Sequence, residues 1–271
     1  MVFGYSLAGL VVGVAVGATG VGGGSLMTPI LILFYGVAPA VAVGTDLLYA
    51  GLSKSFAVAL HGRNGSVDWR IVGDLAAGSV PATLLTLWLL GDSFGSAQMD
   101  SVIKLTLAVA IVVTATATLL RNQLLAFAQH ERFAALRSLH ASGQRPFTVV
   151  AGVLIGVLVT ISSVGAGVIG MMFLMLLYPN HSAVKIVGSD LAHAVIITLI
   201  AGIGHASLGT VDYKLLGLLL IGALPGIWLG TRIGFRLPDS ALRPLIAGVL
   251  LLIGTGMLGS ALAAEWLHDN G

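Results

Sequence analysis

The sequence has no cysteine and few charged residues, and each of these shortages excludes a class of protein. Without cysteine among its 271 residues, the chain forms no disulfide, holds no thiolate-bound metal and has no cysteine-based sulfur relay. Charged residues make up 9% of the chain and hydrophobic residues 57%, with a mean hydropathy of +1.02. A soluble domain has roughly a quarter charged residues, so this composition indicates a polytopic membrane protein. The formal net charge of +2 is too small to indicate a nucleic-acid partner.

The chain contains an internal duplication at an offset of 144 residues. The sequence Gly-Thr-Asp-Leu at 44–47 recurs as Gly-Ser-Asp-Leu at 188–191. The same offset relates His61 to His205, Gly65 to Gly209, Asp68 to Asp212 and Pro81 to Pro225. The repeated aspartates, Asp46 and Asp190, lie inside long apolar segments, where a charge is costly and usually marks a function. Two such positions in matched halves predict a path or site at the interface between repeats.

Hydropathy predicts six full membrane spans of roughly 20 apolar residues, three in each half. They cover residues 41–60, 71–90, 102–120, 183–203, 215–233 and 241–262. The first apolar stretch begins at Val2 without a basic leader or a cleavage motif, so we expect it to belong to the mature fold. We therefore expect an all-α fold, with a first transmembrane repeat over 1–120, a basic cytoplasmic linker over 121–146 and a second transmembrane repeat over 147–271.

Two further apolar segments, at residues 2–36 and 147–178, are too long for one straight span. A helix of over thirty residues is about 50 Å long, against a hydrocarbon core of about 30 Å. Glycine-rich clusters interrupt both segments, at residues 20–25 and 162–167. We predict broken helices or re-entrant hairpins whose glycine tips lie at membrane depth, where protein or a watery cavity satisfies the backbone. Close helix packing through small residues is the alternative.

Lysines and arginines predict the orientation, because cytoplasmic loops carry an excess of them. If each long segment returns to its starting side, the halves have inverted topology, with ten basic residues on the linker side and two on the other. If each segment crosses once, the halves are parallel and the numbers are seven and five. The inverted topology is favoured. It places the linker in the cytoplasm and both termini outside, and it is typical of secondary transporters.

The motifs of both halves resemble those of a known family. They are the cluster at 20–25 followed by Pro29, Pro39 before Gly44-Thr45-Asp46, the segment HGRNGSVDW at 61–69, and the second-half motifs at 165–167, 188–190 and 209–212. These motifs span nearly the whole chain and are similar to the sulfite exporter TauE/SafE family. The resemblance implies a transporter in a bacterial cytoplasmic, or inner, membrane. It also implies export of sulfite or a related small sulfur anion, such as thiosulfate or an organosulfonate.

The glycine tips are candidate anion-binding elements. A glycine-rich turn that leads into a helix presents unpaired N–H groups and the positive end of the helix dipole, which attract small oxyanions. Tips from both halves would aim these groups at one region near the midplane of the membrane. The candidate substrate-binding residues are Gly20, Val21, Gly22, Gly23, Gly24, Ser25, Thr45, Lys54, Ser163, Val164, Gly165, Ala166, Gly167 and Ser189.

Lys54 is the only basic residue within a predicted core span, and the equivalent position in the second half is Thr198. As a cation inside the membrane, it is a candidate to draw an anion inward. The alternatives are that Lys54 pairs with Asp46 or extends along its helix toward an aqueous end.

Asp46, Asp190 and His193 are candidate proton-coupling residues. A carboxylate beside an anion route opposes the substrate unless the carboxyl is protonated or paired. A carboxyl that gains a proton on one side and releases it on the other would couple the anion to the proton gradient. His193 follows Asp190 by three residues and shares its helix face, whereas the equivalent residue in the first half is Tyr49. The alternatives are helix capping by the aspartates or by Thr45 and Ser189, and a hydrogen-bonded core role for the histidine.

Other classes of function fit the sequence less well. Two membrane aspartates also occur in intramembrane aspartyl proteases, but equivalent places in duplicated units favour transport. The common hydrolase signatures are absent, so we expect a non-enzyme with no metal and no cofactor, and a passive anion channel remains the alternative. The expected partners are a small anionic substrate, the lipid bilayer and protons, and the sequence is compatible with a homo-oligomer. Asp68 and Asp212 are expected to cap the helices that follow them.

Overall fold

The computed structural model is all-helical over the residues that it describes, without a strand among them. These residues are 2–19, 24–61, 67–91, 97–120, 123, 141–165, 167–179, 181–234, 244 and 247–259. The predicted all-α class is confirmed for this part of the chain. The candidate residues Gly20, Val21, Gly22, Gly23 and Ala166 lie outside the described residues, as does most of the 121–146 linker.

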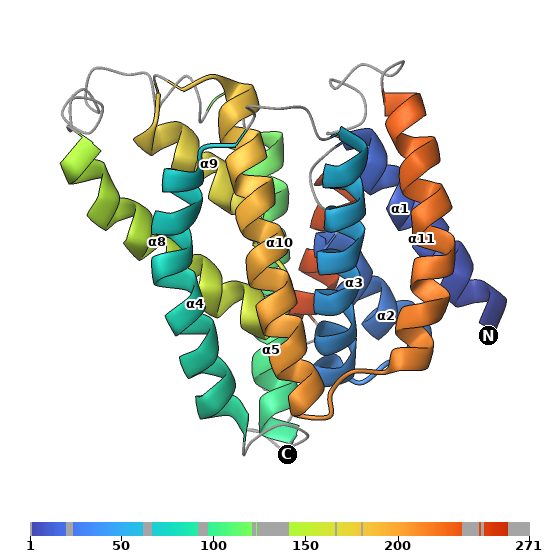
Figure 1. Cartoon of the computed structure of the whole chain (residues 1–271). Helices are drawn as coiled ribbons and strands as arrows, with labels where there is room; N and C mark the ends of the chain where they lie inside the picture. Colours follow the sequence, from blue (N-terminus) through green and yellow to red (C-terminus); the bar gives the residue numbers. More distant parts are fainter. Residues whose placement is uncertain are drawn as a thin grey trace.

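The helices of the two halves follow the duplication (Figure 1). The first half contains α1 (Val2–Thr19), α2 (Gly24–Tyr35), α3 (Pro39–His61), α4 (Trp69–Gly91) and α5 (Ala97–Leu119). The second half contains α8 (Ala141–Ser162), α9 (Val168–Leu177), α10 (Ala183–Ser207), α11 (Tyr213–Gly234) and a helix over Ala247–Gly259. The first residues of α2, α3 and α4 are 24, 39 and 69, and those of α9, α10 and α11 are 168, 183 and 213. Each pair differs by the 144 residues that separate the sequence repeats.

Five helical segments in the described part of the chain are long and apolar enough to cross a membrane. They are Trp69–Gly91, Met99–Leu119, Gly143–Ser162, Val184–Ser207 and Tyr213–Arg232. Four coincide with predicted spans, whereas Gly143–Ser162 belongs to a segment for which the sequence predicts an interruption. The predicted span at 41–60 is helical throughout as α3 but is not one of the five, and the span at 241–262 is described as a helix over Ala247–Gly259. The chain is a multi-pass membrane protein.

Both long apolar segments fold as helical hairpins. Four residues separate α1 from α2, and five separate α8 from α9. In each hairpin the end of the second arm returns to the start of the first. The Tyr35 hydroxyl at the end of α2 donates to the Gly4 carbonyl at 2.7 Å, and Gln144 Nε2 near the start of α8 donates to the Leu177 carbonyl at 2.9 Å.

The halves pack together by exchanging helix partners. Helix α1 of the first half packs against α11 of the second, and α8 of the second half packs against α4 of the first. Glycines allow these backbones to approach closely. A Cβ atom on Gly222 would lie 1.8 Å from the Ser6 carbonyl oxygen, and one on Gly78 would lie 2.0 Å from that of Val149. Gly78 and Gly222 are equivalent by the 144-residue offset, so the same crossing is built twice.

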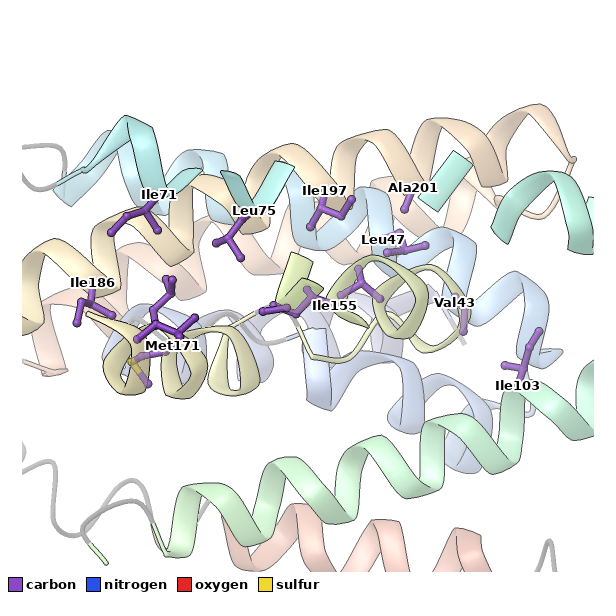
Figure 2. Packing of buried hydrophobic residues seen from close by; sticks show 14 of the residues in the cluster. Val43, Leu47, Ile71, Leu75, Ile103, Ile155, Met171, Ile186, Ile197 and Ala201 are labelled. Carbon is purple, nitrogen blue, oxygen red and sulfur yellow. The ribbon is translucent and has the colours of Figure 1, made fainter. Parts of the chain in front are cut away.

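Helices α3 and α10 pack against each other at the centre of the molecule and run in opposite directions (Figure 1). In that view α3 runs upward and α10 downward, while α4 runs downward and α11 upward. The apolar core around this pair draws side chains from both halves. Figure 2 shows Leu47 of α3, Leu75 of α4, Ile155 of α8 and Ile197 of α10 converging in one cluster. This core fixes the polar residues of α3 and α10 in the interior.

Candidate functional site

Asp46 is fully buried on α3 and meets residues from both hairpins. The Thr28 hydroxyl on α2 donates a hydrogen bond to Asp46 Oδ2. The Ser163 hydroxyl, from the break between α8 and α9, lies beside the same carboxyl and interacts with it. One carboxyl in the centre of the protein is therefore held between two segments that are 135 residues apart in sequence, as the difference between positions 28 and 163 shows.

The break between α8 and α9 has an unusual backbone that places Ser163 at this site. Ser163 has a φ of 59°, and Gly165 and Gly167 have φ of 115° and 132°. Glycine adopts such angles freely, but a serine in the left-handed region costs about 1–3 kcal/mol unless its surroundings hold it there. Ser163 is 3% exposed, so the packed interior supplies that constraint. Val164, a candidate binding residue, is also buried and packs in an apolar cluster with α5.

Asp190 occupies the equivalent position on α10 and lies against the first turn of α9. A Cβ atom on Gly170, the third residue of α9, would lie 2.2 Å from Asp190 Oδ1. The absence of a side chain at Gly170 therefore makes room for the carboxyl. The N-terminal cap of α9 is Gly167, which supplies no side-chain hydrogen bond to the helix. The carboxyl of Asp190 thus lies near a helix N-terminus, the end that carries the positive part of the dipole.

Lys54 interacts electrostatically with both carboxyls and is 2% exposed. It lies seven residues before the end of α3, and Asp190 lies seven residues after the start of α10. Because the end of α3 and the start of α10 lie at the same end of the molecule, Lys54 and Asp190 are at similar depth (Figure 1). Asp46 is eight residues earlier on α3, which is about 12 Å along the helix axis. Lys54 thus interacts with two carboxyls that lie at different depths along the helices.

His193 is buried one turn from Asp190 and reaches α4. Its Nε2 atom lies 2.8 Å from the Ser79 hydroxyl. The equivalent residue on α3, Tyr49, is 1% exposed and lies close to Ser53 and Asp46. The predicted asymmetry between these two positions therefore appears inside the core, where each half contributes a different polar side chain.

Several buried polar atoms of this centre have no hydrogen-bond partner of standard geometry within the described residues. They are Asp46 Oδ1, Tyr49 Oη, Ser53 Oγ, Ser163 Oγ, Asp190 Oδ1 and His193 Nδ1. Buried polar groups are normally satisfied, and each exception is costly enough to call for an explanation. Two pairs among these residues, Asp46 with Ser163 and Tyr49 with Ser53, interact with each other. Their concentration around two acids and a lysine makes this centre a candidate site for protons or a polar ligand.

Thr45 and Ser189, two candidate binding residues, fasten each half to a loop of the other. The Asp212 backbone N–H donates to Thr45 Oγ1 at 3.0 Å, and the Asp68 backbone N–H donates to Ser189 Oγ at 2.8 Å. These two contacts are equivalent by the offset. Both hydroxyls are therefore engaged beside the buried acids, and a role for them in substrate binding stays a prediction.

The loop aspartates cap helices as the sequence predicts. Asp68 Oδ1 accepts from the Arg70 N–H at the start of α4, and Asp212 Oδ1 accepts from the Leu215 N–H at the start of α11. The buried His205 side chain has a structural setting, because its Nδ1 lies 2.9 Å from the Thr210 hydroxyl and its Nε2 lies 3.0 Å from the Thr160 carbonyl oxygen. Of the first glycine tip, Gly24 and Ser25 open α2, and the other candidates lie outside the described residues.

Thr28 and Ser79 are site residues that sequence reasoning missed. Each is a hydroxyl in an apolar helix, and each contacts a predicted proton-coupling residue. A small polar side chain facing the interior of a membrane helix was the available signal. That signal does not name the partner, because the contacts join positions 18 and 114 residues apart.

Comparisons with known proteins agree with this architecture. The family model "Sulfite exporter TauE/SafE" matches residues 5–257 of the chain. "Probable membrane transporter protein YjnA" of Bacillus subtilis (strain 168) is 35% identical over 254 residues, which cover 93% of this chain and 98% of that protein. "Probable membrane transporter protein YdhB" of the same organism is 27% identical over 253 residues, covering 89% and 96%. No solved structure matches the chain. The buried acids, the paired hairpins and the match over almost the full length lead to one conclusion: the chain belongs to the sulfite exporter TauE/SafE family.

Proposed function

We propose that this membrane transporter is a secondary carrier built from two inverted repeats. Its substrate is a small sulfur anion, such as sulfite, thiosulfate or an organosulfonate, which it exports across the bacterial cytoplasmic membrane with coupling to protons. The single observation that carries the proposal is the centre formed by Asp46, Asp190 and Lys54 within apolar helices, in contact with residues of both hairpins.

The charges of this centre explain how a proton and an anion would be linked. With both carboxyls ionised, Asp46, Asp190 and Lys54 carry a net charge of −1, which repels an anion. Protonation of one carboxyl makes the centre neutral and frees Lys54 to attract the substrate, so a proton and an anion are expected to bind together. A divalent anion that leaves with one proton carries net negative charge outward, and a membrane potential that is negative inside favours this movement.

The arrangement of helices supports inverted repeats. Helices at equivalent positions, α3 with α10 and α4 with α11, run in opposite directions, and both hairpins return to the end from which they started. Such repeats bind substrate where broken helices meet near the midplane, and they alternate access by rocking one repeat against the other. Arg70, Arg145 and Lys185 lie in the first turns of α4, α8 and α10, and these three helices begin at the same end of the molecule (Figure 1). This supports placing that end in the cytoplasm.

Transport by the purified protein in proteoliposomes tests the proposal. Flux of sulfite, thiosulfate, sulfate, taurine and chloride is measured at two opposite pH gradients. We expect at least one sulfur anion to move, with a rate that depends on the direction of the pH gradient. Failure of every anion in the panel would refute the substrate class.

The variants Asp46→Asn and Asp190→Asn separate a carrier from a passive anion channel. In a proton-coupled carrier each substitution removes the coupling group, so flux driven by the pH gradient is lost. A channel needs no coupling carboxyl and keeps conducting. Asp100→Asn, in the first turn of α5, is the matched control and is expected to retain wild-type flux.

A further inference from the structure

A cavity of about 650 Å³ with charged residues in its wall opens at the end of the molecule where α4 and α8 begin. Its wall includes Asp68, Arg70 and Asp74 from the start of α4, Arg145 from α8, and Tyr178 and His181 from the segment between α9 and α10. The cavity lies at the base of the α8–α9 hairpin, and Ser163 lies just beyond the other end of α8, beside Asp46. By the rise of a helix, the 17 residues from Arg145 to Ser162 separate these two places by about 25 Å.

The carboxylates of this cavity are more buried than the cationic side chains that pair with them. Arg145 Nε lies 2.8 Å from Asp74 Oδ1, and His181 Nε2 and Lys185 Nζ each lie 3.4 Å from Asp68 Oδ2. The side chains of Asp68 and Asp74 are both 19% exposed, whereas those of Arg145, Lys185 and His181 are 71%, 42% and 30% exposed. A small ligand that enters the cavity therefore meets the cations first.

The sum of charges is positive although both acids are paired. Arg70 and Arg145 of the wall, together with Lys185, which pairs with Asp68 beside the cavity, carry three positive charges against the two negative charges of Asp68 and Asp74, so this group of residues has a net charge of +1 without His181. Arginine presents a planar fork of donors that matches the oxygens of an oxyanion. Two guanidinium groups in the wall and a net positive charge in the surroundings of the cavity favour a small oxyanion over a neutral or cationic ligand.

This cavity is not a by-product of the duplication. At the 144-residue offset, the positions that match Asp74, His181 and Lys185 are Leu218, Val37 and Val41. The opposite end of the molecule therefore has apolar residues where this end has the ion pairs. A feature present in one half only needs a reason that the shared scaffold does not supply.

We propose that this cavity is a loading site for a small oxyanion on the cytoplasmic side, bound by Arg70, Arg145 and His181, with Asp68 and Asp74 as internal competitors. The carboxylates pair with the cations when no anion is bound, and a bound anion replaces the carboxylates as the partner of these cations. The identity of the anion as the transported substrate rests on the proposed function, but binding itself does not. Removal of a competing carboxylate is expected to tighten binding, and removal of a guanidinium is expected to weaken it.

The opposite signs of these two effects make a sharp test on the full-length protein in detergent. Trp69 lines the cavity and is 68% exposed, so its fluorescence reports binding there. Titrations use sodium sulfite, thiosulfate and sulfate, with chloride as reference, at constant ionic strength because salt screens exposed charges. Trp69→Phe identifies the part of the signal that comes from the cavity.

We expect Arg145→Gln to weaken oxyanion binding about tenfold, since the variant loses a charge-assisted hydrogen bond to the oxyanion. We expect Asp74→Asn to tighten binding about threefold or more, and Lys214→Gln at the opposite end to change nothing. Arg70→Gln replaces Arg145→Gln if thermal unfolding shows that the latter does not fold. Equal affinities in all variants, or shifts of the same sign for the arginine and aspartate variants, would overturn the proposal.

Flux measured on the same preparations keeps this inference separate from the proposed function. Asp46→Asn is expected to lose coupled flux but to retain oxyanion binding at Trp69. If sulfur anions are transported but the cavity binds none of them, the loading site fails alone. If the cavity binds an oxyanion and no sulfur anion is transported, the proposed function fails alone.

Discussion

Over the described residues, the two halves of the chain repeat the order and spacing of three helices but carry different charges. The contacts that fasten the halves are built twice, as the pair of bonds from Asp68 to Ser189 and from Asp212 to Thr45 shows. The charged groups are not repeated in the same way, because Lys54 of the first half corresponds to Thr198 of the second. The scaffold is therefore explained by duplication, and the charges that depart from it are the better guide to function.

Breaking the duplicated helix crossings is expected to have the largest effect. Gly78→Leu and Gly222→Leu each place a side chain where even a Cβ atom would lie 2.0 Å or less from a backbone oxygen. Overpacking typically costs about 1–3 kcal/mol and occasionally more, and here the clash is with backbone, which cannot rotate away, so both variants should lose most of their folded protein in size-exclusion and thermal-unfolding measurements. Gly217→Ala on α11, where a Cβ atom meets nothing within 4 Å, is the control. If only one of the two leucine variants is damaged, the crossings are not equivalent.

Replacing Lys54 tests whether transport depends on this residue, which has no basic counterpart in the second half. Lys54→Met leaves the two acids without their cation, and breaking a buried charge pair costs about 3–5 kcal/mol. We expect flux to fall at least tenfold, while Thr198→Val at the equivalent position keeps near wild-type flux. The double variant Lys54→Met with Asp190→Asn should recover thermal stability but not transport. Recovery of both would show that the lysine only balances charge.

A smaller and symmetric effect is expected at the contacts that fasten the halves. Ser189→Ala and Thr45→Val each leave one backbone N–H without its side-chain acceptor, at a cost of about 1 kcal/mol. Both variants should lower the midpoint of thermal unfolding by the same amount, and their effects should add in the double variant. Flux that collapses in either variant without a loss of stability would instead support a direct role in substrate binding.

The smallest expected effect is on the pH dependence of stability at Asp68. Burial raises the pKa of Asp68. The hydrogen bond from the Arg70 amide and the charge of Lys185 lower this pKa by more than burial raises it, so the net shift is downward. A carboxyl with a lowered pKa stabilises the folded state above its unfolded pKa, near 3.9, and this contribution is lost as the pH falls through the folded value. Asp68→Asn should remove a contribution of less than about 1 kcal/mol that salt also weakens. Unfolding followed from pH 7 down to about pH 2 measures it, and an unchanged pH profile in the variant would contradict the assignment.

The sequence predicted the parts of the fold that depend on local patterns. Apolar length located the spans, glycine clusters located the breaks between hairpin arms, and Asp68 and Asp212 were identified as caps from the loops they share. The exchange of helix partners between the halves could not be predicted from the sequence, because a repeated motif does not indicate whether a helix packs within its own half or against the other half. For the same reason the contacts of Thr28 with Asp46 and of Ser79 with His193 could not be foreseen.

The exchange of helix partners also has a consequence for biogenesis. A ribosome releases the first half before α8 and α11 exist, so α1 and α4 enter the lipid with their glycine-lined faces uncovered. Tertiary assembly must then wait until nearly the whole polypeptide has been inserted. Two fragments divided in the 121–140 segment should accordingly be unable to mature separately, yet should complement one another when they are co-expressed.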